Sequence, residues 1–164
     1  MNTSLTIILF QKTSNMQITS YTDYALRVLI YLATSPNKQV TISEIAEFFD
    51  ISRNHLVKVV HQLGSKGFVT TTRGKKGGLS LQRPPEMICI GEVVRSMENH
   101  FNWVECFDPV LQRCRLLPSC GLKHLFARAG NAYLQVLDTA TLEDVLFSSE
   151  LAQLPQKEAF DNMK

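Results

Sequence analysis

The chain has no stretch that could cross a membrane. Hydrophobic residues make up 45% of it and charged residues 20%, and its apolar segments are far shorter than the roughly 18 residues of a transmembrane helix. The apolar segment Leu5–Phe10 lacks the preceding basic region and the following small-residue cleavage site of a signal peptide. We therefore predict a cytoplasmic protein that makes no membrane contact.

Acidic residues are missing from one long internal segment. From Ser52 to Pro84 the chain carries seven lysines or arginines and no aspartate or glutamate. Because the whole chain has a net charge of only +2, its remaining residues are net acidic. A basic stripe on an otherwise acidic protein is typical of a surface that binds a polyanion, although a basic face that only contacts solvent is the alternative.

Four regions are expected along the chain. Residues 1–15 precede a better globular sequence that opens at Met16, and we interpret them as a disordered extension or the product of a misassigned start codon. A short strand or helix packed on the body is the alternative. Residues 16–85 and 86–147 form the two structured regions, and residues 148–164 form a flexible tail.

Three helices are predicted in the first structured region. Apolar residues at helical spacing place one helix over 22–34. Thr41 and Glu44 form a capping box at the start of a second helix that runs to Phe49. Asp50-Ile51-Ser52 is a tight connection, after which Ser52 can cap a third helix that Gly67 ends.

A hairpin follows these helices. Residues 68–72 are rich in β-branched residues and predict one strand, and residues 79–81 predict its partner. Between them lies a basic, glycine-rich turn, residues 73–78. Helix, helix–turn–helix and hairpin in this order predict a mainly α fold with a small β-hairpin, a winged helix-turn-helix.

The third helix and the hairpin carry the residues expected to bind DNA. The exposed start of a recognition helix reaches base edges first, where arginine suits guanine and asparagine suits adenine. Glycines at the wing tip let the backbone approach DNA closely, and cations there neutralise phosphate. The predicted DNA-binding residues are Ser52, Arg53, Asn54, His55, Lys58, Arg73, Lys75 and Lys76. A winged helix that contacts only proteins is the alternative, and the wing lacks the full P-loop pattern.

The second structured region combines a cysteine loop with a long helix. A short helix over 90–97 is followed by a loop from Phe101 to Cys120. A helix of about five turns over 122–137 carries a continuous apolar stripe. A brief element over 141–147 ends the region.

Three of the four cysteines lie in that loop. Cys106, Cys114 and Cys120 are separated by seven and five residues, which is wider than the pairs of a structural zinc site. Thiolates also bind iron–sulfur clusters. A metal site, a thiol redox switch and a chance grouping all remain open on spacing alone. Cys89 stands apart and is expected to be a small buried residue.

These motifs, taken together, resemble a known family. Residues 16–27, the recognition segment 51–58, the wing 73–78 and the loop 114–123 resemble the iron–sulfur winged-helix regulators that include the nitric-oxide-sensing NsrR repressors and IscR. The resemblance runs from Met16 to about Phe147, and the recognition helix, wing and cysteine loop are most similar to the NsrR branch.

The resemblance implies a homodimeric repressor that binds a double-stranded DNA operator, and no enzyme. It implies one iron–sulfur cluster per subunit, [4Fe–4S] or [2Fe–2S], held by Cys106, Cys114 and Cys120. Asp23 of the other subunit would supply the fourth ligand, whereas the position of Asp23 also suits a helix N-cap. The long helix would form the dimer interface, or alternatively pack on its own domain.

Nitric oxide is the signal that the resemblance implies, with genes of nitrosative stress as the targets. IscR-like proteins have a histidine where this chain has Lys123, which favours the NsrR branch and leaves His124 as a weaker candidate ligand. The alternatives are an IscR-like regulator of cluster biogenesis, a cofactor-free thiol redox regulator and a zinc-stabilised protein-interaction module.

Overall fold

The computed structural model describes residues 18–36, 39–74, 77–110, 113–117 and 119–146. The elements are α1 (Ser20–Ala33), α2 (Ile42–Phe49), α3 (Arg53–Ser65), β1 (Val69–Thr72), β2 (Gly78–Leu81), η1 (Pro85–Met87), α4 (Ile90–Met97), η2 (Glu105–Phe107), α5 (Gly121–Asp138) and α6 (Leu142–Leu146). No helix in this described part is long and apolar enough to cross a lipid bilayer. The mainly helical winged fold predicted from the sequence is confirmed.

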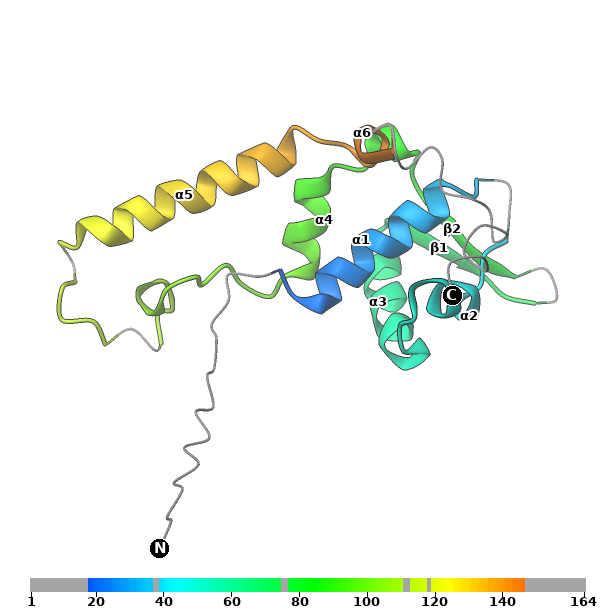
Figure 1. Ribbon diagram of the computed structural model, residues 1–164, viewed down its shortest axis with the longest axis horizontal. Helices are drawn as coiled ribbons and strands as arrows, with labels where there is room; N and C mark the ends of the chain where they lie inside the picture. Colours follow the sequence, from blue (N-terminus) through cyan, green and yellow to red (C-terminus); the bar gives the residue numbers. More distant parts are fainter. Residues whose placement is uncertain (1–17, 37–38, 75–76, 111–112, 118, 147–164) are drawn as a thin grey trace, which may run out of the picture.

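The head of the molecule, which comprises α1 to α4, the hairpin and α6, is built around α1. This helix crosses the middle of the head, with α2, α3 and the hairpin on one side and α4 and α6 on the other (Figure 1). Its apolar face is fully buried at Ala25, Val28 and Leu29. The same core takes side chains from each neighbour, among them Ile45, Leu56, Val59, Leu63, Phe68, Val93 and Leu142. One apolar core therefore fixes the recognition helix and the wing together.

Helix starts follow the predicted caps with two exceptions. Thr41 and Glu44 form both hydrogen bonds of the capping box at α2. Helix α1 begins at Ser20 rather than at 22, because the Thr19 hydroxyl accepts from the backbone N–H of Thr22. Ser52 is the N-cap residue of α3, as predicted, but its side chain makes no capping hydrogen bond there.

The wing is a short antiparallel hairpin. Val69 pairs with Leu81 and Thr72 with Gly78, so β1 begins one residue later than predicted and β2 one residue earlier. An isolated bridge between Val40 and Leu79 ties β2 to the segment before α2. At the tip Gly74 has φ of +107°, a conformation that glycine adopts without strain.

Residues 88–95 of the α4 region contact residues 138–142 at the end of α5, and we call this contact the joint. The backbone N–H of Ile90 donates to Ala140 at 2.9 Å, and that of Leu142 donates to Ile88 at 2.8 Å. Arg95 pairs with Asp138 across the same joint, at 2.6 Å from Nη1 to Oδ1, and this hydrogen bond lowers the pKa of Asp138. Cys89 lies here half-buried, 3.7 Å from the Asp138 carbonyl oxygen, so the prediction of full burial was wrong.

Beyond this joint α5 projects away from the head (Figure 1). None of its 18 residues is buried. Leu122, Leu125 and Val136 expose 60%, 55% and 68% of their surface. The alternative in which this helix packs fully on its own domain therefore does not hold within the described residues.

Arg83 has a different role from the other cations of the basic stripe. Its guanidinium donates two hydrogen bonds to the carboxylate of Glu92 on α4, each 3.1 Å long. It also lies over the ring of Phe68, 4.7 Å from the ring centroid. Its charge is neutralised within the protein, so Arg83 anchors the wing to α4 and does not add to the basic surface.

Replacing Arg83 should therefore destabilise the fold. Arg83→Met removes a partly buried ion pair and a cation–π contact, and we expect the free energy of unfolding to fall by about 1–2 kcal/mol. Urea denaturation followed by circular dichroism measures this. Arg73→Met is the matched control, because Arg73 is exposed and has no ion pair among the described residues. Equal stability of the two variants would contradict the anchoring role.

Candidate DNA interface and cysteine loop

Helix α3 divides cleanly into a buried face and an exposed face. Leu56, Val59, Val60 and Leu63 lie in the core. The five residues of this region that were predicted to meet DNA lie on the solvent side: Ser52, Arg53, Asn54, His55 and Lys58. Because the buried face fixes the helix, its polar residues form a rigid surface at the start of α3, where major-groove contacts are usually made.

Arg53 is held by the preceding helix. Its Nε–H donates to the Ser43 hydroxyl of α2 at 3.3 Å. This contact uses the Nε side of the guanidinium and leaves both Nη groups able to pair with a guanine edge. The helix–turn–helix arrangement thus orients the residue that is best suited to reading sequence.

The wing contributes less to the described surface than the sequence predicted. Arg73 is exposed at the end of β1. Lys75 and Lys76 lie outside the described residues. Gly77 donates its N–H to Gly74 at 2.8 Å, and a Cβ on Gly77 would lie 2.2 Å from the Thr72 carbonyl oxygen. Only glycine fits this tight turn between the strands.

The loop cysteines are free thiols in different environments. Cys106 lies in η2 and is half-buried, Cys114 is exposed, and Cys120 is the half-buried N-cap residue of α5. Within the residues that the structure describes, no three cysteine, histidine or acidic side chains lie together as a metal site. The structure therefore places the three thiols in one loop without bringing them into one cluster.

The donor set nevertheless fits an iron–sulfur cluster. Three reduced, soft thiols in a single loop are the ligands that such clusters use. Cys106 lies in η2, Cys120 lies at the start of α5, and the exposed Cys114 lies between them in the sequence. Movement of the loop would be needed to gather the thiols.

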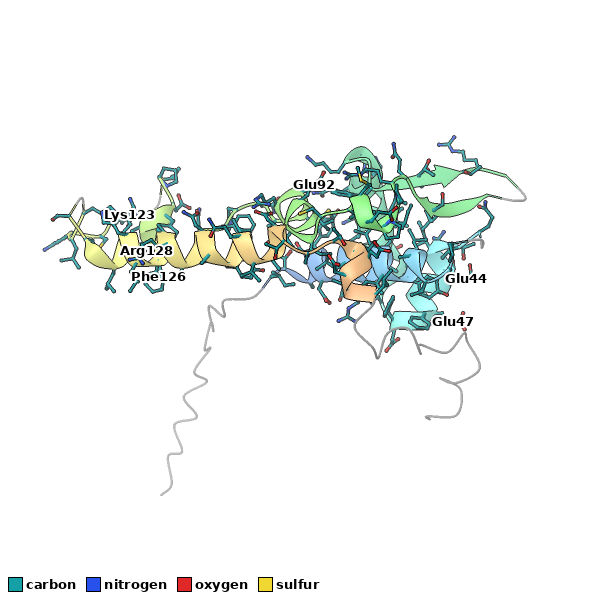
Figure 2. All side chains as sticks on the ribbon, turned by 90° about the horizontal axis from the view of Figure 1, so that it is seen from above. Glu44, Glu47, Glu92, Lys123, Phe126 and Arg128 are labelled. Atoms are coloured by element: carbon teal, nitrogen blue, oxygen red, sulfur yellow. The ribbon has the colours of Figure 1, made fainter. Side chains whose placement is uncertain are left out.

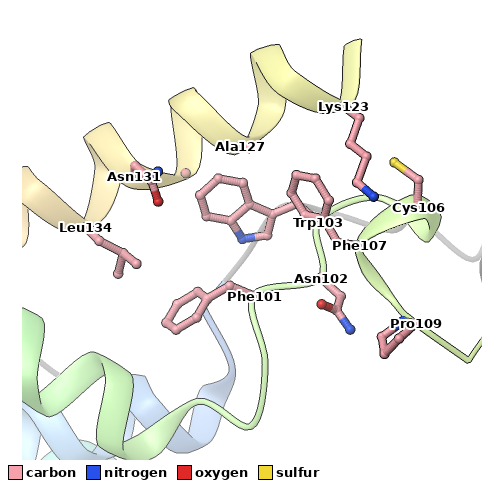
Figure 3. A pocket seen from close by; sticks show the side chains of 11 residues that line it. Phe101, Asn102, Trp103, Cys106, Phe107, Pro109, Lys123, Ala127, Asn131 and Leu134 are labelled. Atoms are coloured by element: carbon pink, nitrogen blue, oxygen red, sulfur yellow. The ribbon is translucent and has the colours of Figure 1, made fainter. Parts of the chain in front are cut away.

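A cavity of about 510 Å³ lies between the loop and α5, with Cys106 on its wall. Trp103 projects from the loop toward α5, and Lys123 lies beside Cys106 (Figure 3). The Trp103 ring packs edge-on against Tyr133, with ring centroids 5.8 Å apart. A Cβ on Gly130 would lie 2.6 Å from the Trp103 ring, so this glycine permits the close approach that fastens the loop to the helix.

Asp23 is not a helix cap. Thr19 caps α1, and Asp23 lies in the first turn, where its carboxylate pairs with Arg27 at 2.7 Å. The alternative reading of Asp23 as an N-cap is therefore wrong. The side chain remains partly exposed, which a ligand reaching toward another subunit requires. The i,i+4 spacing of Asp23 and Arg27 was a signal for this ion pair that the sequence analysis did not use.

The N-terminal part of α5 lies at one end of the molecule (Figure 2). Lys123, Phe126 and Arg128 lie at this end, opposite the end of the molecule that carries Glu44 and Glu47 (Figure 2). His124 is exposed on the same helix.

Trp103 and Gly130 are the residues that sequence reasoning missed, since a lone tryptophan and a helical glycine give no pattern.

Comparisons with known proteins agree with this geometry. The family model described as "Rrf2: Iron-dependent Transcriptional regulator" matches residues 18–148. The HTH-type transcriptional regulators NsrR of Bacillus licheniformis and Bacillus subtilis are 51% and 52% identical to the chain over 136 residues. These matches cover 82% of this chain and 95% and 93% of the two relatives.

A solved structure shows the same fold. IscR of T. potens superposes with a TM-score of 0.67 at 24% identity, covering 89% of this chain and 97% of that one. The family consists of DNA-binding transcription regulators and not of enzymes. With its exposed recognition helix, its wing and its cysteine loop, the chain belongs to the Rrf2 family of transcriptional regulators.

Proposed function

We propose that this regulator is a cytoplasmic homodimeric repressor that binds a palindromic operator and releases it in response to nitric oxide, through an iron–sulfur cluster held by the loop cysteines. The observation that carries the proposal is the presence in one chain of an exposed, acid-free recognition helix and a loop of three free thiols joined to a projecting helix. The similarity to NsrR regulators supports the same function.

Operator binding would depend on α3 and the wing. Arg53 and Asn54 would read bases in the major groove, with Ser52 and His55 beside them. Lys58 lies one turn further along the helix, where it would neutralise phosphate. Arg73, Lys75 and Lys76 would contact the backbone or the minor groove from the wing.

The apolar stripe of α5 would form the dimer interface. Its exposed side chains recur every three or four residues along the helix, from Leu122 through Leu125 to Val136. An uncovered apolar stripe of this length is unfavourable in water, and pairing with the same stripe of a second copy would bury it. The same pairing would set the distance between the two recognition helices.

The cluster would be held by Cys106, Cys114 and Cys120, with Asp23 of the other subunit as the fourth ligand. When bound, it would supply an iron centre that reacts with nitric oxide. A carboxylate ligand suits this role, because it is a harder and more easily displaced donor than a thiolate. For Asp23 to reach the partner's loop, its ion pair with Arg27 must open or be shared.

Loop and helix would then carry the signal within each chain. Trp103 holds the loop against Gly130 and Tyr133 of α5, so release of the thiols would alter this packing and the helix that pairs the two subunits. The energetic requirement is modest, since a coupling of about 3 kcal/mol changes affinity roughly 150-fold.

Arg53 is expected to read a base directly. Arg53→Ala should weaken operator binding by about 1–3 kcal/mol and relax the preference at one base position of each half-site. Footprinting and binding titrations with single-base operator variants measure both effects. Lys58→Ala is the matched control, expected to weaken binding to every sequence alike and to reduce its salt dependence. An unchanged footprint for Arg53→Ala would show that Arg53 does not read bases.

The role of the α5 stripe in the dimer can be tested with a single charge. Leu125→Glu places a charge in the middle of the apolar stripe and should weaken association by about 3 kcal/mol or more, roughly 150-fold. Sedimentation velocity measures the monomer fraction. Gln135→Glu adds the same charge beside the stripe and should leave the dimer intact. A Leu125→Glu chain that sediments as wild type would place the interface elsewhere.

The loop cysteines are expected to be required for cluster loading. Anaerobically purified wild-type protein should contain iron and sulfide and absorb visible light, and Cys114→Ala should lose all three while its helical circular dichroism is retained. Cys89→Ala is the control and should load normally, because Cys89 lies at the joint of α4 and α5 and not in the loop.

The same preparations separate the rival functions. A colourless wild-type protein without iron or sulfide would favour a thiol redox regulator. A loaded protein that keeps its operator under nitric oxide but releases it on iron starvation would favour an IscR-like regulator of cluster biogenesis. Normal iron content in Cys114→Ala would show that the ligand set is wrong.

A further inference from the structure

The hydroxyl of Tyr21 ties α1 directly to the recognition helix. Tyr21 lies in the first turn of α1 and is half-buried at the edge of the core. Its O–H donates to the backbone carbonyl of Lys58 on α3 at 2.7 Å, a typical length for a good O–H···O hydrogen bond. A helix carbonyl has a second lone pair, so it can accept this bond while remaining in the helical ladder.

This contact meets the DNA-facing part of α3. Lys58 exposes its side chain to solvent and follows Arg53 by five residues, while its backbone carbonyl accepts the hydrogen bond from Tyr21. A tyrosine hydroxyl is protonated at neutral pH and can donate, and burial raises the pKa of Tyr21 further above its ordinary value. The bond therefore fixes the backbone of Lys58, whose side chain is predicted to contact phosphate.

Two further hydrogen bonds join the same end of the head to α4. The Thr19 N–H donates to Glu98 Oε1 at 2.8 Å, and the Gln62 side-chain amide donates to the Ser96 carbonyl oxygen at 2.8 Å. Ser96 lies in the last turn of α4 and Glu98 is its C-cap. Three helices are thus bonded pairwise at one end, immediately before the loop that begins at Phe101.

We propose that Tyr21 is a positioning residue that locks the recognition helix against α1 and α4, so that specific operator binding depends on its hydroxyl while non-specific binding does not. The inference rests on the proposed use of α3 in operator binding. Non-specific binding needs only cations near phosphate, whereas bidentate base contacts need the helix at a fixed angle and depth.

The variant Tyr21→Phe removes only the hydroxyl. Tyr24→Phe is the matched control, since Tyr24 is half-buried on the same helix and its hydroxyl makes no hydrogen bond within the described part of the chain. The full-length chain, purified anaerobically, is titrated with the duplex that the wild type protects in footprinting and with a scrambled duplex of the same length. Urea denaturation of each variant reports any general loss of stability.

We expect Tyr21→Phe to bind the protected duplex about two- to tenfold more weakly, the range that loss of one neutral hydrogen bond gives. Its affinity for the scrambled duplex, and both affinities of Tyr24→Phe, should match wild type. Unchanged discrimination between the duplexes in Tyr21→Phe, or an equal loss in Tyr24→Phe, would overturn the positioning role. A wild-type chain that protects no duplex at all would refute the proposed DNA function itself.

Discussion

The packing of α1 on α3 and α4 is the contact on which the rest of the molecule depends. Val28 and Leu29 of α1 are fully buried, as are Val59 of α3 and Val93 of α4. Burial of each such side chain contributes on the order of 1.5–3 kcal/mol. Because this one core holds three helices, the recognition surface, the start of α1 and the entrance to the cysteine loop keep a fixed relation to one another.

The polar connections of the head lie around this core and have distinct tasks. Arg83 joins the wing to α4 through Glu92, Arg53 is oriented by Ser43, and Tyr21 joins α1 to α3. The Arg53 and Tyr21 hydrogen bonds are exposed and add little to stability by themselves, whereas the partly buried Arg83 pair adds about 1–2 kcal/mol. Their common effect is to restrict the orientation of elements that the apolar core already holds together, which is what reading a base sequence requires.

The head could be predicted closely because its elements have local signals. The capping box of Thr41 and Glu44, the apolar face of α3 and the glycine-rich turn each act within a few residues, and all were found in the expected places. The prediction of the basic surface from summed charges was less accurate. Arg83 counted toward the basic stripe, but its partner Glu92 lies outside that segment, and a linear sum of charges cannot detect such pairing.

The candidate site was predictable only in its residue types. Three cysteines in one loop indicate soft-metal chemistry, yet how thiols approach one another depends on long-range packing, as when Trp103 closes on Gly130. The environment of Cys89 was misjudged for the same reason, since α5 returns to it from 48 residues further along the chain. A ligand expected from another subunit is harder still to predict from a single sequence, because it depends on how two chains pack together.

The joint between α4 and α5 has a consequence for the spacing of DNA sites. Backbone hydrogen bonds on both sides of Cys89 and the Arg95–Asp138 pair make this joint stiff. In the dimer proposed above, each projecting helix then holds its own head at a fixed distance from the dimer interface. Target selection would include the number of base pairs between half-sites, and a duplex with the right bases but half a helical turn of extra spacer would present its second half on the wrong side.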